Sequence, residues 1–160
     1  MLKIHFNRFL KIFFISLFCS YFQTVKASYI FIPMDDTQKN HLKAYGIAYL
    51  SIKSNTYVDW LLNYQGGSFM MKYNRYLENE CNIRGVSYNI IADVQTTQIL
   101  RSITAPDVNQ DVVRLEKAPK IAIYSPNNKQ PWDDAVTLAL TYAEIPYDCL
   151  LYTSPSPRDS

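Results

Sequence analysis

Short runs of polar residues follow several apolar segments of the chain, and these runs hold side chains that could do chemistry. Asp35, Asp36 and Thr37 come directly after the apolar residues 29–33. Their carboxylates could bind a sugar hydroxyl, a cation or an amine, because an ionised carboxylate accepts hydrogen bonds at both oxygens. One of them could instead cap a helix that starts nearby. Both interpretations place this run just after a strand.

A glycine-containing turn is the second candidate. It consists of Gln65, Gly66, Gly67 and Ser68. Backbone N–H groups of such a turn could approach an anion, although a plain chain reversal uses the same residue types. The GxxxxGK[ST] spacing of a phosphate-binding loop is absent. Asp93 follows a third apolar run and is a candidate either for ligand contact or for a helix cap.

A third polar run follows the apolar residues 120–124. It contains Ser125, Asn127, Asn128 and Trp132. The indole of Trp132 beside two amides could stack on a sugar or a base, and it could equally pack the loop. Together the three runs predict a site for a small polar ligand.

Covalent and metal chemistry have little support in the sequence. Cys81 and His41 are the only cysteine and histidine between residues 28 and 148. Cys81 falls within a helical pattern and not on the sharp turn that exposes a nucleophile, and nothing in the sequence pairs it with His41. We therefore expect a structural cysteine, assign no catalytic residue, and expect neither a metal nor a cofactor.

The segments that must position these residues alternate between strand and helix patterns. Strands are expected at residues 29–33, 56–64, 86–91 and 120–124, and helices at 42–52, 76–84, 93–103 and 132–145. Short, apolar strands alternating with helices predict an α/β fold. The expected architecture is a parallel sheet with helices on both faces, in a three-layer, Rossmann-like arrangement. Ligands bind such sheets at the carboxyl ends of the strands, where the candidate residues would gather.

The same order of strand, polar loop, helix and strand starts at residue 29 and again at residue 120. This repetition predicts two related lobes: residues 28–105 form the first, 106–119 connect them with a short ordered stretch at 112–115, and 120–148 begin a second, truncated lobe.

The two ends of the chain differ from the rest. Residues 1–27 have a basic start, an uncharged apolar stretch at 12–22 and small residues before a cleavage point, which predicts a signal peptide and an exported protein in the periplasm or cell envelope. We expect the protein to contact the membrane only through this signal peptide, before it is cleaved. Residues 149–160 resemble a translated sequencing adapter, and we interpret them as a non-native tail.

Charge and cysteine content change once these ends are set aside. Of the 16 basic residues four lie in the leader and one in the tail, and of the 14 acidic residues one lies in the tail, so residues 28–148 carry 11 basic and 13 acidic side chains. This balance provides no basic field for nucleic acid. Cys81 alone cannot form an internal disulfide. We therefore expect a packed core and no nucleic-acid partner.

Four segments of the chain, residues 29–45, 60–71, 78–88 and 115–148, resemble a family of exported Bacteroidota proteins commonly labelled asparagine synthetase B. Residues from 120 onward are also similar to the opening of class I glutamine-amidotransferase-like domains. These resemblances imply an envelope enzyme of amidotransferase-like or hydrolase-like type, with its nucleophile beyond residue 148. The sequence lacks the SGGxDS-type loop of glutamine-dependent asparagine synthetases, so no catalytic residue is carried over.

Three functions remain open at this point. The first is the amidotransferase-like or hydrolase-like enzyme. The second is a non-catalytic binding module for a sugar or small polar ligand. The third is glutamine-dependent asparagine synthesis as the family label states it.

Overall fold

Five strands form the main sheet of the computed structural model, which describes residues 28–125 and 135–151. The strands are β1 (Tyr29–Ile32), β2 (Val58–Leu62), β3 (Ser68–Lys72), β4 (Asn89–Ile91) and β5 (Asp111–Leu115). Their order is β4-β1-β3-β2-β5, and every neighbouring pair is antiparallel. The predicted parallel sheet, Rossmann-like or class I glutamine-amidotransferase-like, is therefore wrong.

The error follows from how the helices connect the strands. Helix α2 (His41–Lys53) links β1 to β2, and α3 (Arg75–Ile83) links β3 to β4. Strands β1 and β2 both pair antiparallel with β3, so they are parallel to each other but not adjacent. This is the split β-α-β arrangement of ferredoxin-like sheets, extended by α4 (Asp93–Ile103) and β5. A strand–helix–strand pattern in the sequence does not show whether the two strands are neighbours or whether another strand, here β3, lies between them.

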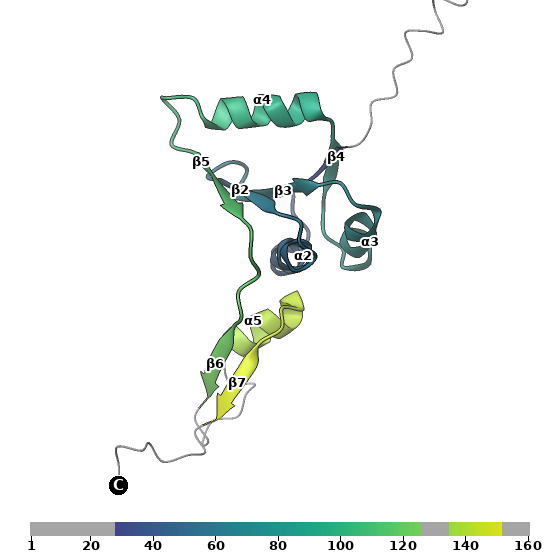
Figure 1. Ribbon diagram of the computed structural model, residues 1–160, viewed down its shortest axis with the longest axis vertical. Coiled ribbons are helices and arrows are strands. Elements are labelled where there is room, and N and C mark those ends of the chain that lie inside the picture. The colour runs from purple at the N-terminus through teal and green to yellow at the C-terminus, as the bar shows by residue number, and fades with distance from the viewer. Residues whose placement is uncertain (1–27, 126–134, 152–160) are drawn as a thin grey trace, which may run out of the picture.

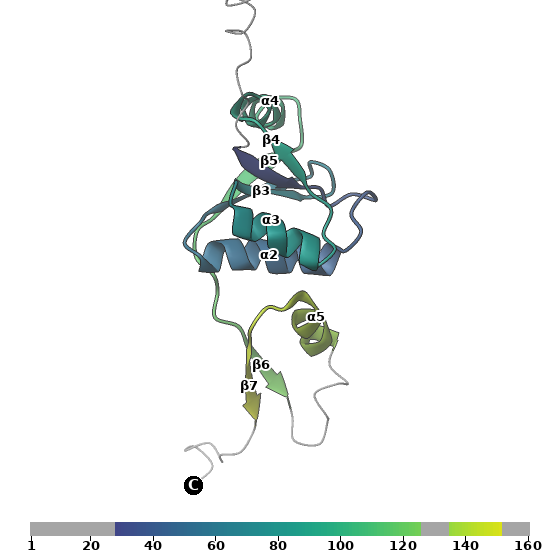
Figure 2. The same ribbon diagram turned by 90° about the vertical axis from the view of Figure 1, so that its right-hand side faces the viewer.

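Helices cover both faces of the sheet. Figures 1 and 2 show α2 and α3 on one face and α4 on the other. Because side chains alternate along a strand, Ile30 and Ile32 of β1 pack toward α2 and α3, while Phe31 packs toward α4. All three side chains are buried. Burial on both faces explains the wholly apolar strands that suggested a parallel sheet.

Asparagine side chains start the two helices on the first face. Asn40 accepts a hydrogen bond from the Lys43 backbone N–H at 3.2 Å, and Asn74 accepts one from Tyr76 at 2.9 Å. Helix α2 thus begins after Asn40, and the expectation that Asp35 or Asp36 caps it is wrong.

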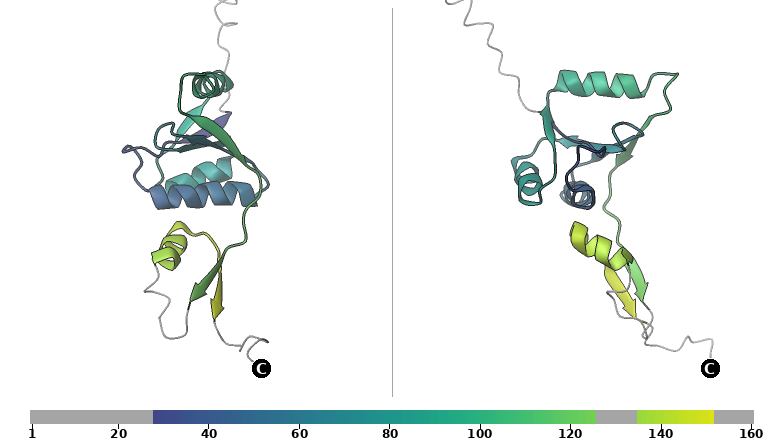
Figure 3. Two further views of the ribbon diagram at one scale, coloured as in Figure 1. Left: turned by 90° about the vertical axis from the view of Figure 1, so that its left-hand side faces the viewer. Right: turned by 180° about the vertical axis from the view of Figure 1, so that it is seen from behind.

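A smaller unit follows the main sheet. The chain leaves β5 through residues 116–121 and forms β6 (Ala122–Ser125), α5 (Ala135–Ala143) and β7 (Asp148–Leu151). Strands β6 and β7 pair in parallel. Figure 3 shows this unit on the α2 side of the main sheet. Strand β7 includes residues 149–151 of the segment interpreted as a non-native tail.

The predicted signal peptide, at residues 1–27, and residues 152–160 lie outside the described part of the chain. Within the described ranges, no helix has the length and apolar character needed to cross a membrane.

Candidate functional site

Two of the predicted polar runs meet at one edge of the main sheet. The loop after β1 and the turn after β2 lie together because β1 and β2 run in the same direction. The backbone N–H of Met34 donates to the carbonyl of Gln65 at 2.9 Å. Gly66 has φ +77° and lies so close to Met34 that a Cβ atom there would be 2.2 Å from the Met34 carbonyl oxygen. Of the loops expected to gather at one edge, these two therefore meet, although the main sheet is antiparallel.

The side chains at this edge hydrogen-bond within the loops. The Thr37 hydroxyl and backbone N–H both donate to Asp35 Oδ1, the latter at 3.0 Å, and they lower the pKa of the Asp35 carboxyl. Ser68 Oγ donates to the Tyr64 carbonyl at 3.0 Å, and Gly67 accepts from the Trp60 indole at 3.0 Å. This edge therefore has the hydrogen bonding of a structural loop pair, while Asp36 is exposed.

The other predicted residues lie elsewhere. Asp93 follows β4, which is antiparallel to β1, and so it lies at the opposite edge from Asp35. It is the first residue of α4, whose N-cap is Ala92. Ser125 ends β6, which runs away from the main sheet (Figure 1). The predicted contacts Asn127, Asn128 and Trp132 lie outside the described residues.

Cys81 and His41 do not form a catalytic pair in this structure. Cys81 is fully buried, and burial raises the pKa of its thiol to about 12, so the thiolate that acts as a nucleophile is disfavoured. The Nε2 atom of His41 lies 3.2 Å from the backbone carbonyl oxygens of Met34 and Asp35. Among the described residues, no group of three or more His, Cys, Asp or Glu side chains is placed to hold a metal ion.

The structure contains an apolar pocket that the sequence interpretation missed. Its volume is about 230 Å³. It lies between α2, the main sheet and the smaller unit, and its lining residues are Tyr45, Ala48, Tyr49, Ile52, Trp60, Phe69, Leu115, Pro119, Ile121 and Ile145. We call this cavity the aromatic pocket.

Aromatic rings form one side of the aromatic pocket. The Phe69 ring stacks with Trp60 at a centroid distance of 6.2 Å and forms a T-shaped contact with Tyr45 at a centroid distance of 5.3 Å. The Trp60 indole N–H is bonded to Gly67, and the Tyr49 hydroxyl donates to the Pro119 carbonyl at 3.3 Å. These polar atoms are therefore engaged with backbone, and the pocket presents mainly apolar surface.

A second hollow adjoins the aromatic pocket and shares Tyr49 and Ile121 with it. Its volume is also about 230 Å³, and its lining residues are Tyr49, Lys120, Ile121, Pro146, Tyr147 and Asp148. We call it the polar hollow, because it brings an ammonium and a carboxylate beside the apolar cavity.

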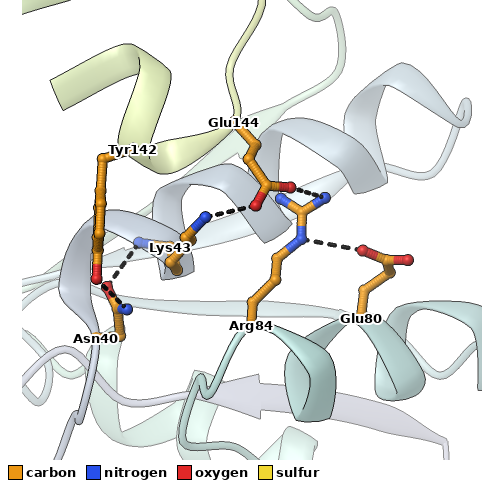
Figure 4. Close-up of polar contacts among 6 residues, drawn as sticks. All are labelled: Asn40, Lys43, Glu80, Arg84, Tyr142 and Glu144. Atoms are coloured by element: carbon orange, nitrogen blue, oxygen red, sulfur yellow. Dashed lines mark hydrogen bonds and ion pairs between the residues drawn. The ribbon is translucent and has the colours of Figure 1, made fainter. Parts of the chain in front are cut away.

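Ionic contacts hold the smaller unit against α2 and the end of α3. Figure 4 shows Glu144, just after α5, between Lys43 of α2 and Arg84 at the end of α3. The Arg84 contact is 2.9 Å, and Lys43 followed by Arg84 lowers the pKa of the Glu144 carboxyl. We call Lys43, Arg84 and Glu144 the α5 clamp.

Two further contacts support the α5 clamp. The Asn40 amide donates to the Tyr142 hydroxyl oxygen at 2.9 Å, and the Lys43 ammonium lies 5.0 Å from the Tyr142 ring centroid. Gly46 lies against the end of α5, where a Cβ atom would come within 1.9 Å of the Ala143 carbonyl oxygen. The shape of the aromatic pocket therefore depends on a close approach between α2 and α5.

The signal for this pocket was only partly present in the sequence. Tyr45 and Tyr49 are four residues apart and so share one side of α2. That spacing appears in the sequence as an ordinary core-facing pattern. Leu115, Pro119 and Ile145 come from segments whose positions depend on the order of the strands.

Comparisons with known proteins identified no relatives: a scan against protein-family models, a search of curated proteins and a search of solved structures each found no match.

Proposed function

We propose that this chain is an exported binding module that takes the apolar part of a small molecule into the aromatic pocket. The observation that carries this proposal is an open apolar pocket of about 230 Å³ whose lining includes a stacked Trp60–Phe69 pair. A cavity of about 150 Å³ with a comparable lining is sufficient for benzene. The aromatic pocket therefore has room for one ring or a branched aliphatic group.

The described residues favour binding over catalysis. Cys81 is buried, with the pKa of its thiol raised to about 12. The polar edge formed by the loops after β1 and β2 uses Asp35 within its own loop. A sugar needs several hydrogen-bond partners, whereas the aromatic pocket offers ring faces and aliphatic groups. Export and membership in the family labelled asparagine synthetase B are proposed from residues 1–27 and from the sequence segments described above.

Titration with benzyl alcohol tests the proposal through Trp60 fluorescence. Trp132→Phe leaves Trp60 as the only tryptophan. Burying one ring removes roughly 150–250 Å² from water, which at about 25 cal/mol per Å² corresponds to roughly 4–6 kcal/mol before binding costs. Association costs offset part of this free energy, so we expect a saturable fluorescence change with a Kd in the millimolar range.

Filling the pocket supplies the control. Ala48→Leu adds side-chain volume from α2 into the cavity, and Leu115→Phe adds it from β5. Both are expected to abolish the saturable change, while Val94→Leu, on the exposed side of α4, leaves it intact. Circular dichroism checks that each variant is folded. A fluorescence response that is linear in concentration, or one that folded Ala48→Leu and Leu115→Phe retain, contradicts the proposal.

A further inference from the structure

The polar hollow gives the proposed ligand a second chemical feature. Lys120 precedes β6 and Asp148 begins β7, and both line this hollow. The backbone N–H of Asp148 donates to the Ile121 carbonyl at 2.8 Å, which fixes the start of β7 beside the residues that precede β6. Lys120 and Asp148 thus line one hollow, and both are exposed residues.

The two cavities share part of their lining. Tyr49 and Ile121 border both of them. A molecule with its apolar end in the aromatic pocket would therefore place its other end beside Lys120 and Asp148. A head group that satisfies both charges carries a carboxylate for Lys120 and an ammonium for Asp148.

We propose that the ligand is a free amino acid with an aromatic or branched apolar side chain. This inference rests on the proposed function, since it assumes that the aromatic pocket binds an apolar group. The side chain fills the aromatic pocket, the α-carboxylate pairs with Lys120, and the α-ammonium pairs with Asp148. A peptide end supplies only one of the two charges at its terminal residue, which favours the free amino acid.

Titration of the Trp132→Phe full chain with L-phenylalanine tests the inference. Charge-assisted hydrogen bonds are worth about 10-fold or more in affinity. L-phenylalanine is therefore expected to bind at least about 10-fold more tightly than benzyl alcohol. Phenylalaninamide, which lacks the carboxylate, and N-acetylphenylalanine, which lacks the ammonium, are each expected to lose about 10-fold relative to L-phenylalanine.

Protein variants test the same contacts from the other side. Lys120→Ala and Asp148→Asn are expected to weaken L-phenylalanine binding about 10-fold and to leave benzyl alcohol binding unchanged. Lys117→Ala, an exposed lysine outside the lining of both cavities, is the matched control. Lys120→Arg keeps the charge and is expected to retain most of the affinity.

The possible outcomes separate this inference from the proposed function. If L-phenylalanine, its amide and its acetyl derivative all bind the protein with the same affinity as benzyl alcohol, the amino-acid inference is overturned. The proposal of an apolar binding pocket would still stand. Equal binding of L-asparagine and L-phenylalanine also overturns it, because the aromatic pocket would then contribute nothing. If neither benzyl alcohol nor L-phenylalanine binds, both proposals fail.

Discussion

Single side chains in the loop after β1 hold neighbouring segments together through hydrogen bonds and are not free to bind a ligand. Gln38 is only 5% exposed, and its amide N–H groups donate to the carbonyls of Pro33 and Ser87 at 2.8 and 3.1 Å. Its carbonyl oxygen accepts from the Ser87 backbone N–H at 2.8 Å. A buried amide without hydrogen-bond partners would be costly in free energy. Gln38 finds its partners in both segments and thereby joins the loop after β1 to the segment before β4.

Gly66 gives the first test at this scale. Gly66→Ala places a Cβ atom against the Met34 backbone and also strains a left-handed φ of +77°. Gly85, with φ +66° and nothing within 4 Å of its added Cβ, is the matched control for backbone strain alone. We expect Gly85→Ala to cost about 1–2 kcal/mol and Gly66→Ala about 1–3 kcal/mol more. Urea unfolding measures both, and equal costs would show that the contact with Met34 does not constrain the loop.

The reactivity of Cys81 gives the second test. Because burial raises the pKa of the Cys81 thiol to about 12, we expect the native protein to be almost unreactive toward a thiol reagent at pH 8. Cys149 is exposed, so the measurement uses a Cys19→Ser, Cys149→Ser background. Labelling should occur at the rate of unfolding and become fast in denaturant. Rapid labelling of the folded chain would instead indicate an accessible thiolate.

At the scale of elements, α2 contacts the main sheet, the aromatic pocket and α5 with different residues. Ala44, Ile47 and Ala48 pack on the main sheet, and Tyr45 and Tyr49 line the aromatic pocket. Its Lys43 and Gly46 contact the end of α5. A helix can do this because residues three and four apart share a side, so successive sides meet different neighbours.

Hydrogen exchange tests the difference between the two sheets. β6 and β7 form a pair of strands with Tyr124 and Leu150 more than half exposed, whereas β1 and β3 are central and buried on both faces. We expect amides of β6 and β7 to exchange orders of magnitude faster than those of β1 and β3, since a two-strand sheet opens at little cost. Equal protection in the two sheets would contradict this expectation and indicate one cooperative unit.

At the scale of the whole molecule, the α5 clamp joins the smaller unit to the main sheet and so completes the aromatic pocket. Ile121, just before β6, and Ile145, just after α5, line the pocket on one side, and Trp60 and Phe69 line it from the sheet. Docking and ligand binding should therefore respond together to any change that separates the two.

The clamp predicts a dependence of docking on pH. Lys43 and Arg84 lower the pKa of Glu144 below its ordinary value of 4.5, so the folded state favours the charged carboxylate. Its stabilising contribution is fully present above pH 4.5 and is lost as the pH falls through the lowered pKa. The effect is small because the Glu144 side chain is 48% exposed. Benzyl alcohol affinity measured from pH 7 to pH 3 should fall at the acid end, and Glu144→Gln should remove the part of that fall that is due to the clamp.

Gly46 separates docking from the stability of the main sheet. Gly46→Ala favours the α2 helix by about 1 kcal/mol in propensity but collides with the Ala143 carbonyl. We expect the main sheet to remain folded by circular dichroism, while limited proteolysis near α5 becomes faster and benzyl alcohol binding is lost. Unchanged proteolysis and binding would show that α5 can dock without this close approach.

The sequence by itself determined most of the local structure. The patterns at residues 42–52, 76–84 and 93–103 predicted α2, α3 and α4 to within a few residues, because helical periodicity is a local property. The wholly apolar residues 29–33 predicted a strand buried on both faces. These helix and strand predictions depend on neighbours along the chain. The loops after β1 and β2 do lie at one end of the sheet, as expected, although the expectation assumed a parallel sheet and the main sheet is antiparallel.

Only the tertiary structure decided which strands are adjacent and where a pocket lies. The sequence pattern at residues 68–72 did not predict a strand. In the structure, β3 lies between β1 and β2 and pairs antiparallel with both. That insertion gains burial for Phe69, Met70 and Met71 on both faces, a long-range effect with no local signature. The aromatic pocket has the same origin, because Trp60, Leu115 and Ile145 meet only after the strand order and the docking of α5 are fixed.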